Sequence, residues 1–229
     1  MSTHELGIDV EADQHVSGLL QVPAQARACY VLAHGAGAGM AHPFMAAVAQ
    51  GLYERGIATL RYQFPYMERG SRRPDAPRLA HATVRAAVAE AARQLPELPL
   101  FAGGKSFGGR MTSQAQALSP LPGVRGLVFI GFPLHPAGKP SDERAAHLSD
   151  VAVPMLFLQG SRDELARLDL LRPLVARLGS SATLEVFEHA DHSFHVPARS
   201  GGNDAQVMAL LLDTMAAWIA RVGAPSGPA

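Results

Sequence analysis

The stretch of sequence that decides the fold reads Leu100-Phe101-Ala102-Gly103-Gly104-Lys105-Ser106-Phe107-Gly108-Gly109-Arg110. It contains the pattern G-x-S-x-G centred on Ser106, after an apolar run and before a helix-like segment. A serine on a sharp turn between a strand and a helix exposes its hydroxyl, and the residues two before and two after must be small to avoid collision. The stretch therefore predicts a nucleophile elbow with Ser106 as the nucleophile.

Two other glycine-rich motifs fail when their residues are counted. Gly104-Lys105-Ser106 ends like a phosphate-binding loop, but the first glycine of that motif would fall at Pro99. The glycines between Gly35 and Gly39 hint at a dinucleotide fingerprint, but its third glycine would fall at Met40 or His42 and no acidic residue ends the next strand. No cofactor is therefore expected.

Outside the elbow, short apolar runs alternate with helix-like segments. Continuous apolar strands separated by helices indicate parallel strands buried on both faces. An N-terminal hairpin is expected from the alternating stretches 6–10 and 15–20, which flank a polar turn at Asp13-Gln14. The fold class predicted is α/β, with a mostly parallel central sheet, helices on both faces and no cap domain. The expected strands are 29–33, 57–61, 98–102, 126–131, 153–159 and 183–187, and the expected helices are 43–55, 79–95, 107–118, 165–178 and 204–222.

Length and composition favour one globular domain. The chain has 229 residues, 48% of them hydrophobic, which is enough to bury a sizeable core. No linker divides it, so residues 1–222 are expected to form a single domain and residues 223–229 a frayed tail. Lys and Arg together number 20, and so do Asp and Glu, so no charge excess supports a nucleic-acid partner.

Targeting and redox signals point to a cytoplasmic protein. The single cysteine, Cys29, lies in an apolar run and is expected to be a small core residue. The N-terminus lacks a basic region followed by an apolar stretch, and the longest apolar stretch, near 207–220, contains Asp213 and is too short to span a bilayer. No membrane partner is expected.

An acid and a base are expected after later strands, in the order Ser, Asp, His. Asp163 follows the strand predicted at 153–159, and His192 follows the last strand. His192 would take the proton of Ser106 through one ring nitrogen while Asp163 holds the other. The neighbouring Glu164 is interpreted as a favourable charge in the first turn of a helix. A metal site at His189, His192 and His195 is not expected, because no H-E-x-x-H pattern or nearby cysteine accompanies them.

The segment His34-Gly35-Ala36-Gly37-Ala38-Gly39 suits a loop that donates backbone N–H groups to a developing oxyanion. The N–H of Ala36 is the expected donor, with Gly37 as an alternative because alternation of glycine and alanine leaves the register open. The second donor would be the N–H of Phe107, immediately after the nucleophile.

With these motifs in place, the chain resembles the α/β-hydrolase superfamily over residues 5–222. The phrases HGAGAG, FPYM, GGKSFGGR, GSRDE and DHSF are similar to a small cap-less branch often called dienelactone-hydrolase-like. That branch is similar to the hydrolase-like domain in a subunit of the animal NSL histone-acetyltransferase complex. The elbow departs from the most familiar esterases in carrying Lys105 before the serine.

The residues and the resemblance together predict a serine hydrolase acting on a small ester or thioester through an acyl-enzyme. The rival hypothesis is a non-catalytic interaction module that keeps the fold. Only residues 132–151 separate two predicted strands where superfamily members often carry a lid, so an open site is expected. The protein is expected to be a monomer or a small homo-oligomer. Its substrate mouth is expected to include Met40, Phe64, Tyr66, Lys105 and Phe194.

Overall fold

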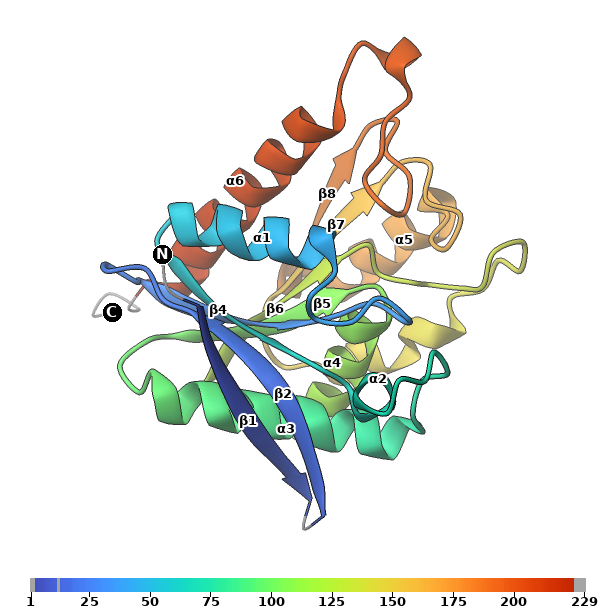
Figure 1. Cartoon of the computed structure of the whole chain (residues 1–229). Coiled ribbons are helices and arrows are strands. Elements are labelled where there is room, and N and C mark those ends of the chain that lie inside the picture. The colour runs from blue at the N-terminus through green and yellow to red at the C-terminus, as the bar shows by residue number, and fades with distance from the viewer. Residues whose placement is uncertain (1–2, 12, 225–229) are drawn as a thin grey trace, which may run out of the picture.

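A computed structural model describes residues 3–11 and 13–224, and its centre is an eight-stranded sheet (Figure 1). The strands lie in the order β1-β2-β4-β3-β5-β6-β7-β8. β3 to β8 run parallel, whereas β2 pairs antiparallel with both β1 and β4. Their bounds are β1 Thr3–Glu11, β2 Gln14–Gln21, β3 Ala28–Ala33, β4 Ile57–Tyr62, β5 Leu100–Lys105, β6 Val124–Ile130, β7 Met155–Gly160 and β8 Ala182–Phe187.

The central strands are buried along their whole length. Every residue of β3, β4 and β7 is buried, which is why these strands read as continuous apolar runs rather than as alternating ones. The mostly parallel sheet with an antiparallel hairpin at its edge confirms the predicted fold class.

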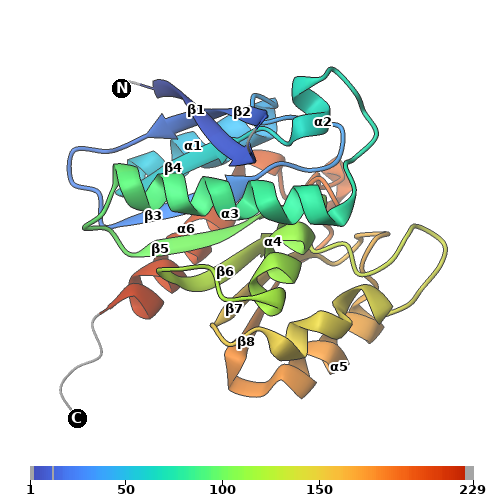
Figure 2. The same ribbon diagram turned by 90° about the horizontal axis from the view of Figure 1, so that it is seen from below.

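Helices cover both faces of the sheet (Figures 1 and 2). α1 (Pro43–Glu54) and α6 (Asp204–Gly223) pack on one face, and α3 (Pro77–Gln94), α4 (Phe107–Leu118) and α5 (Leu168–Leu178) pack on the other. Two separate hydrophobic clusters result, one on each face. The remaining elements are short: α2 (Pro65–Glu68) and the 3₁₀ segments η1 (Glu143–Asp150), η2 (Gly179–Ser181) and η3 (Ala198–Ser200).

The strand order reverses direction at β3. From β3 the chain moves outward through α1 to β4, and then crosses back through α3 to β5 on the other side of β3. The loops that leave β3 and β5 therefore run in opposite directions over the sheet, and ligands of open α/β sheets bind in the crevice at such a switch point. The elbow at the end of β5 lies at this point.

Most predicted elements lie close to the observed ones, and two differ for a local reason. The helix expected at 165–178 begins only at Leu168, because the backbone N–H of Leu165 donates to the side chain of Asp163 and that of Ala166 to its carbonyl, which fixes a turn before the helix. The strand expected at 98–102 extends to Lys105, because its two glycines continue the pairing with β6.

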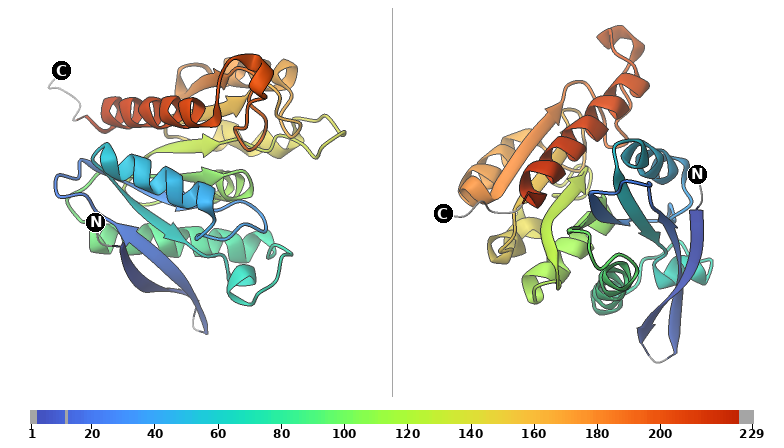
Figure 3. Two further views of the ribbon diagram at one scale, coloured as in Figure 1. Left: turned by 45° about the horizontal axis from the view of Figure 1, so that its top comes forward. Right: turned by 90° about the vertical axis from the view of Figure 1, so that its left-hand side faces the viewer.

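α6 is the one helix in the described part of the chain that is long and apolar enough to cross a membrane. It lies against the sheet (Figure 3), and its inward side chains are buried. One side of α6 thus contributes to the hydrophobic cluster on that face of the sheet. The buried residues are Leu211, Leu212, Met215, Trp218 and Ile219. Of the expected C-terminal tail, Gly223 ends α6 and residues 225–229 lie outside the described residues.

The connection between β6 and β7 carries no cap domain. It contains the 3₁₀ segment η1, which packs against α4 through buried Leu148 and a hydrogen bond of 2.7 Å between His147 Nε2 and Ser113 Oγ. The segment therefore lies down on the outer side of α4 and leaves the C-terminal edge of the sheet uncovered.

Candidate active site

Ser106 lies between β5 and α4 in a conformation that few non-glycine residues adopt. Its φ is 50° and its ψ is −116°, and such strain persists where the surrounding structure enforces it. The two flanking glycines allow the turn to press against β3. A Cβ on Gly104 would lie 2.2 Å from the carbonyl oxygen of Ala33, and one on Gly108 would lie 2.6 Å from the carbonyl oxygen of His34.

The structure brings Ser106, His192 and Asp163 into one chain of hydrogen bonds. The Oγ of Ser106 lies 2.9 Å from Nε2 of His192, and Nδ1 of His192 lies 2.7 Å from Oδ2 of Asp163. Asp163 follows β7, and His192 lies in the segment between β8 and α6. Because the carboxylate only accepts, Nδ1 of His192 carries the proton and Nε2 is left to accept from the serine hydroxyl.

The carboxylate of Asp163 is buried, and both of its oxygens accept hydrogen bonds. Its Oδ1 accepts from the backbone N–H of Leu165 at 2.8 Å, and its Oδ2 accepts from Nε2 of Gln159 as well as from His192. Gln159 is itself oriented, because its Oε1 accepts from the backbone N–H of Phe132 at 3.0 Å. Gln159 was not expected at the site, since its only signal in the sequence is a polar residue at the end of an otherwise apolar strand.

The loop after β3 presents a free backbone N–H, that of Ala36, to the cavity beside the serine. The N–H of Gly37 donates to the hydroxyl of Tyr66 at 3.1 Å. Within the described residues, the N–H groups of Ala36 and Phe107 have no hydrogen-bond partner, and Ala36 lines the same cavity as Ser106. The geometry therefore favours Ala36 over Gly37 as the donor of this loop.

His34 shapes that loop from within. Its Nδ1 donates to the carbonyl of Gly35 at 2.8 Å, and its Nε2 accepts from the backbone N–H of Phe64 at 3.0 Å. Burial lowers the pKa of His34 to about 4, so the ring is neutral at pH 7 and keeps this donor–acceptor pattern. The histidine thus connects the loops that follow β3 and β4.

A cavity of about 490 Å³ opens above Ser106. Most of its wall is apolar, with His42, Lys105, Ser193 and the Ser106–His192 pair as the polar exceptions. The complete lining is Gly35, Ala36, Ala38, His42, Phe44, Met45, Lys105, Ser106, Leu165, His192 and Ser193.

Of the five residues expected at the substrate mouth, only Lys105 lines this cavity. Phe64 and Tyr66 are fully buried, because they pack edge-on against His34 beneath the loop after β3. Phe194 is buried too, and stacks behind the ring of Phe44. These placements correct the expectation for Phe64, Tyr66 and Phe194.

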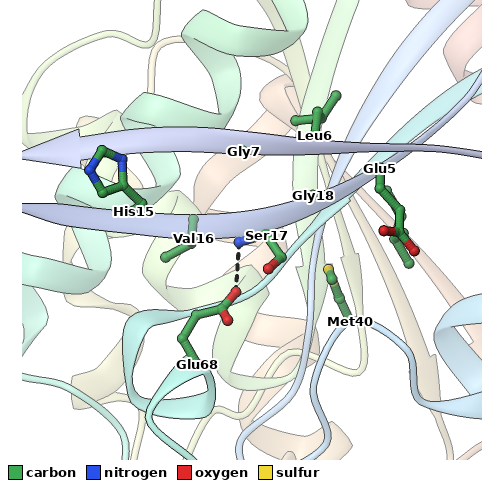
Figure 4. A pocket seen from close by; sticks show the side chains of 10 residues that line it. Glu5, Leu6, Gly7, His15, Val16, Ser17, Gly18, Met40 and Glu68 are labelled. Atoms are coloured by element: carbon green, nitrogen blue, oxygen red, sulfur yellow. Dashed lines mark hydrogen bonds between the residues drawn. The ribbon is translucent and has the colours of Figure 1, made fainter.

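Met40 faces a different cavity, which corrects the fifth expectation. The N-terminal hairpin projects past the end of its pairing with β4 (Figure 3), and a cavity of about 640 Å³ lies beneath it. Met40 and Glu68 line this cavity from below (Figure 4), and Glu68 accepts a hydrogen bond of 2.6 Å from the backbone N–H of Ser17. Neither Ser106 nor His192 lines it.

A more polar cavity adjoins the cavity above Ser106 at His192. Its volume is about 500 Å³, and it shares Leu165 and His192 with the cavity above Ser106. Its other lining residues are Arg162, Glu164, Asp191, His195 and Pro197. The imidazole of His192 therefore stands at the boundary between an apolar and a polar space.

The described residues contain no group of three or more His, Cys, Asp or Glu side chains placed to hold a metal ion. The imidazole of His195 is paired with Asp204 at the start of α6, through Nδ1 and Oδ2 at 2.8 Å. The backbone N–H of His189 donates to Oγ of Ser161.

Comparison with known proteins decides the family. A family described as an alpha/beta hydrolase domain matches residues 26–220, which is most of the chain. This chain belongs to the α/β-hydrolase family. The match confirms the resemblance to α/β-hydrolases that the sequence motifs predicted. Similar solved structures include hydrolases and an esterase domain, and together with the family they support a hydrolase.

Solved structures of α/β-hydrolases share the fold at low sequence identity. A dienelactone hydrolase from Anabaena variabilis is 21% identical with a TM-score of 0.78, and the match covers 96% of this chain and 97% of that one. An α/β serine hydrolase without a lid from Xanthomonas campestris is 20% identical with a TM-score of 0.74, covering 99% and 97%. A serine hydrolase homologue from Coxiella burnetii is 19% identical with a TM-score of 0.75, covering 94% and 98%.

Proposed function

We propose that this α/β-hydrolase is a serine hydrolase that cleaves a small ester or thioester through an acyl-enzyme intermediate. The observation that carries the proposal is the hydrogen-bonded chain from Ser106 through His192 to Asp163, at a strained elbow that opens into a cavity. A nucleophile, a base and an orienting acid in this arrangement are the parts that acyl transfer requires.

In the first half of the reaction, Ser106 Oγ attacks the acyl carbon while Nε2 of His192 takes the hydroxyl proton. Negative charge then develops on the former carbonyl oxygen. The free N–H groups of Ala36 and Phe107 flank the serine and would stabilise this charge. The tetrahedral intermediate collapses when the imidazolium of His192 protonates the leaving oxygen or sulfur.

The second half reverses these roles with water. His192, neutral again after the leaving group departs, removes a proton from a water molecule, which attacks the acyl-serine ester. Asp163 holds the imidazole in the required tautomer and stabilises its charged form throughout. The acid is released and the serine hydroxyl is restored, so the cycle needs no cofactor.

The two cavities around His192 suggest how the substrate is oriented. The leaving atom must lie beside Nε2 of His192 to receive its proton, so the leaving group extends past His192 toward the polar cavity lined by Arg162 and Glu164. The acyl group then occupies the apolar space beside Phe44 and Met45. The substrate class that fits is an ester or thioester with an apolar acyl group and a polar leaving group.

Labelling with a fluorophosphonate probe tests the proposal. Phosphonylation joins the probe's phosphorus to Ser106 Oγ with loss of fluoride, so the wild type should gain the mass of one adduct and Ser106→Ala should gain none. Ser193→Ala is the matched control, since Ser193 lines the same cavity without a hydrogen bond to His192. Absence of labelling in folded wild-type protein would support the non-catalytic interaction module instead.

The cytoplasmic location and the monomeric or small homo-oligomeric state stay predictions.

A further inference from the structure

The side chain of Lys105 links the nucleophile to the loop that carries the base. Its Nζ donates a hydrogen bond of 2.6 Å to the backbone carbonyl oxygen of His192. Because Lys105 directly precedes Ser106, this bond runs beside the 2.9 Å contact between Ser106 Oγ and His192 Nε2. The strand end and the loop are thus tied twice, once through the reacting groups and once through the ammonium.

The loop that carries His192 is strained on both sides of that residue. His189 and Phe194 have φ angles of 64° and 63°, in the left-handed region that non-glycine residues rarely occupy. Such residues keep this conformation only where surrounding contacts enforce it. Contacts that hold the loop therefore decide where the imidazole stands.

Apart from the bonds of the His192 imidazole to Ser106 and Asp163, the other hydrogen bonds of the loop hold the backbone of residues next to His192. Oδ1 of Asp191 accepts from the backbone N–H groups of Ser193 and His195, at 2.7 and 3.0 Å. The carbonyl of Ala190 accepts from the N–H of Arg162 at 2.9 Å. Within the described residues, the partner of the His192 carbonyl is Lys105.

The surroundings of the Lys105 ammonium favour a positive charge despite its burial. Nζ lies 5.9 Å from the centre of the Phe44 ring and 5.7 Å from that of Phe194, within the range of cation–π attraction. The carboxylates of Asp163 and Asp191 add attraction. Burial is the larger effect and lowers the pKa of Lys105 to about 8.

We propose that Lys105 is a positioning residue for the general base: its ammonium clamps the backbone of His192 and so holds the imidazole at hydrogen-bond distance from Ser106. The inference rests on the proposed serine hydrolase function and assigns Lys105 no contact with the reacting atoms. It follows that removing the ammonium lowers the rate of the chemical steps and leaves substrate binding largely intact.

Lys105→Met is the main test, because methionine keeps most of the apolar stem and loses the donor. We expect kcat with nitrophenyl butyrate to fall about ten- to a hundredfold, the effect of a small misplacement of a catalytic group, with KM within about threefold of the wild type. The chain has one other lysine, exposed Lys139, and Lys139→Met should leave both constants unchanged. Unchanged kcat in Lys105→Met, or a rise in KM alone, would overturn the proposal.

Chemical rescue separates positioning from general damage to the fold. In Lys105→Cys, the thiolate displaces bromide from 2-bromoethylamine and gives a thioether that ends in an ammonium at lysine length. We expect this treatment to restore most of kcat, whereas alkylation with iodoacetamide, which adds a neutral amide, should not. Cys29 stays unmodified in the folded protein, because it is fully buried and burial raises the pKa of its thiol to about 12. Failure of the ammonium to restore kcat would contradict the clamp.

The pH profile supplies a further readout. Since the ammonium loses its proton near pH 8, kcat of the wild type should decline above that pH, and Lys105→Met should lack this decline. The charged and titratable groups around the clamp are Asp163 after β7, Asp191 and His192 after β8, and His42, which lines the same cavity before α1. A decline of equal size and midpoint in both proteins would assign it to another group and overturn this reading of Lys105.

Hydrogen exchange shows whether the loop itself is released. We expect peptides covering 188–196 to exchange faster in Lys105→Met than in the wild type, while those from β5 and β6 keep their protection. Equal exchange in both proteins would contradict the clamp. The two hypotheses fail separately: an unlabelled wild type contradicts the hydrolase function, and an active Lys105→Met contradicts only the positioning role.

Discussion

Asp163→Asn should cost most of the activity, because every hydrogen bond of the Asp163 carboxylate is an accepted one. Oδ1 accepts from the N–H of Leu165, and Oδ2 accepts from Gln159 and His192. An asparagine must direct its NH₂ group at one of these two positions. If the NH₂ group points toward Leu165, it meets the backbone N–H of that residue, and two donors face each other. If it points toward His192, it meets the NH₂ group of Gln159, which cannot turn around without losing the hydrogen bond to Phe132.

Both orientations harm catalysis, by different amounts. With the NH₂ group toward His192, Nδ1 of His192 must accept a hydrogen bond, so the ring proton moves to Nε2. His192 then has the wrong tautomer to act as a base, and this fault lowers kcat by a factor of about 10⁴ in serine proteases. With the NH₂ group toward Leu165 the tautomer survives, because the amide oxygen still accepts from Nδ1 of His192. The negative charge that stabilises the imidazolium is lost, which costs up to about 3 kcal/mol or a factor of about 10². We therefore expect kcat to fall by about 10² to 10⁴.

The same donor–donor conflict should lower the free energy of unfolding by about 1–3 kcal/mol, since one buried polar group stays unsatisfied. Initial rates with nitrophenyl butyrate and urea unfolding monitored by circular dichroism measure the two effects. Asp142→Asn is the matched control, because it alters an exposed carboxylate paired with Arg177 at the surface. A kcat within tenfold of the wild type, particularly if Glu164→Gln or Asp191→Asn abolished activity, would refute the assignment of Asp163.

Four further outcomes are expected. Gly108→Ala should lower the free energy of unfolding by about 1–3 kcal/mol, because its Cβ would lie 2.6 Å from backbone of the strand end, whereas Gly7→Ala, with nothing within 4 Å, should be close to neutral in the same urea titration. The free energy of unfolding should decrease as the pH is lowered from about 6.5 to about 4. Burial lowers the pKa of His147 to about 4, so the unfolded chain takes up a proton at this residue at a higher pH than the folded protein does. The urea midpoint should decrease less over this range in His147→Gln than in the wild type. Among nitrophenyl acetate, butyrate, octanoate and palmitate, kcat/KM should be highest for a short acyl chain. Because no lid extends the apolar wall, each distal CH₂ stays exposed and does not gain most of the ~0.8 kcal/mol that burial of a CH₂ provides. A maximum at octanoate or palmitate would instead indicate an apolar channel. Glyceryl monobutyrate should be hydrolysed faster than its isomer butyl glycerate, after each rate is normalised to alkaline hydrolysis, and the reverse preference would contradict the proposed orientation of acyl and leaving groups.

The alternation of strands and helices could be predicted from the sequence because it depends on local pattern. Parallel strands buried on both faces need uninterrupted apolar runs, and β3 and β4 show them. The helix after the elbow has the predicted bounds, Phe107–Leu118, since the serine before it and the break after Leu118 are both local signals. The short helix α2, with its four residues, carried no periodicity and was missed.

The order of the site residues could also be predicted, since it follows from topology. Parallel strands end at one edge of a sheet, so polar residues that follow β5, β7 and β8 meet there. Ser106, Asp163 and His192 were predicted as site residues in this way, and the structure places them within hydrogen-bond distance. The sequence pattern left Ala36 and Gly37 as alternative oxyanion donors, and the hydrogen bond from Gly37 to Tyr66 favours Ala36.

Side-chain direction in the irregular loops was decided only by tertiary structure. Phe64 and Tyr66 follow a strand just as the site residues do, yet both turn inward to pack against His34, and Met40 turns toward the hairpin. Lys105 reads in the sequence as a residue beside the nucleophile, but its bond to His192 joins positions 87 apart in the chain. A strand or helix has a repeat that fixes which face each residue takes, whereas a loop has none. There, a side chain points wherever packing and hydrogen bonding with distant segments leave it the lowest free energy.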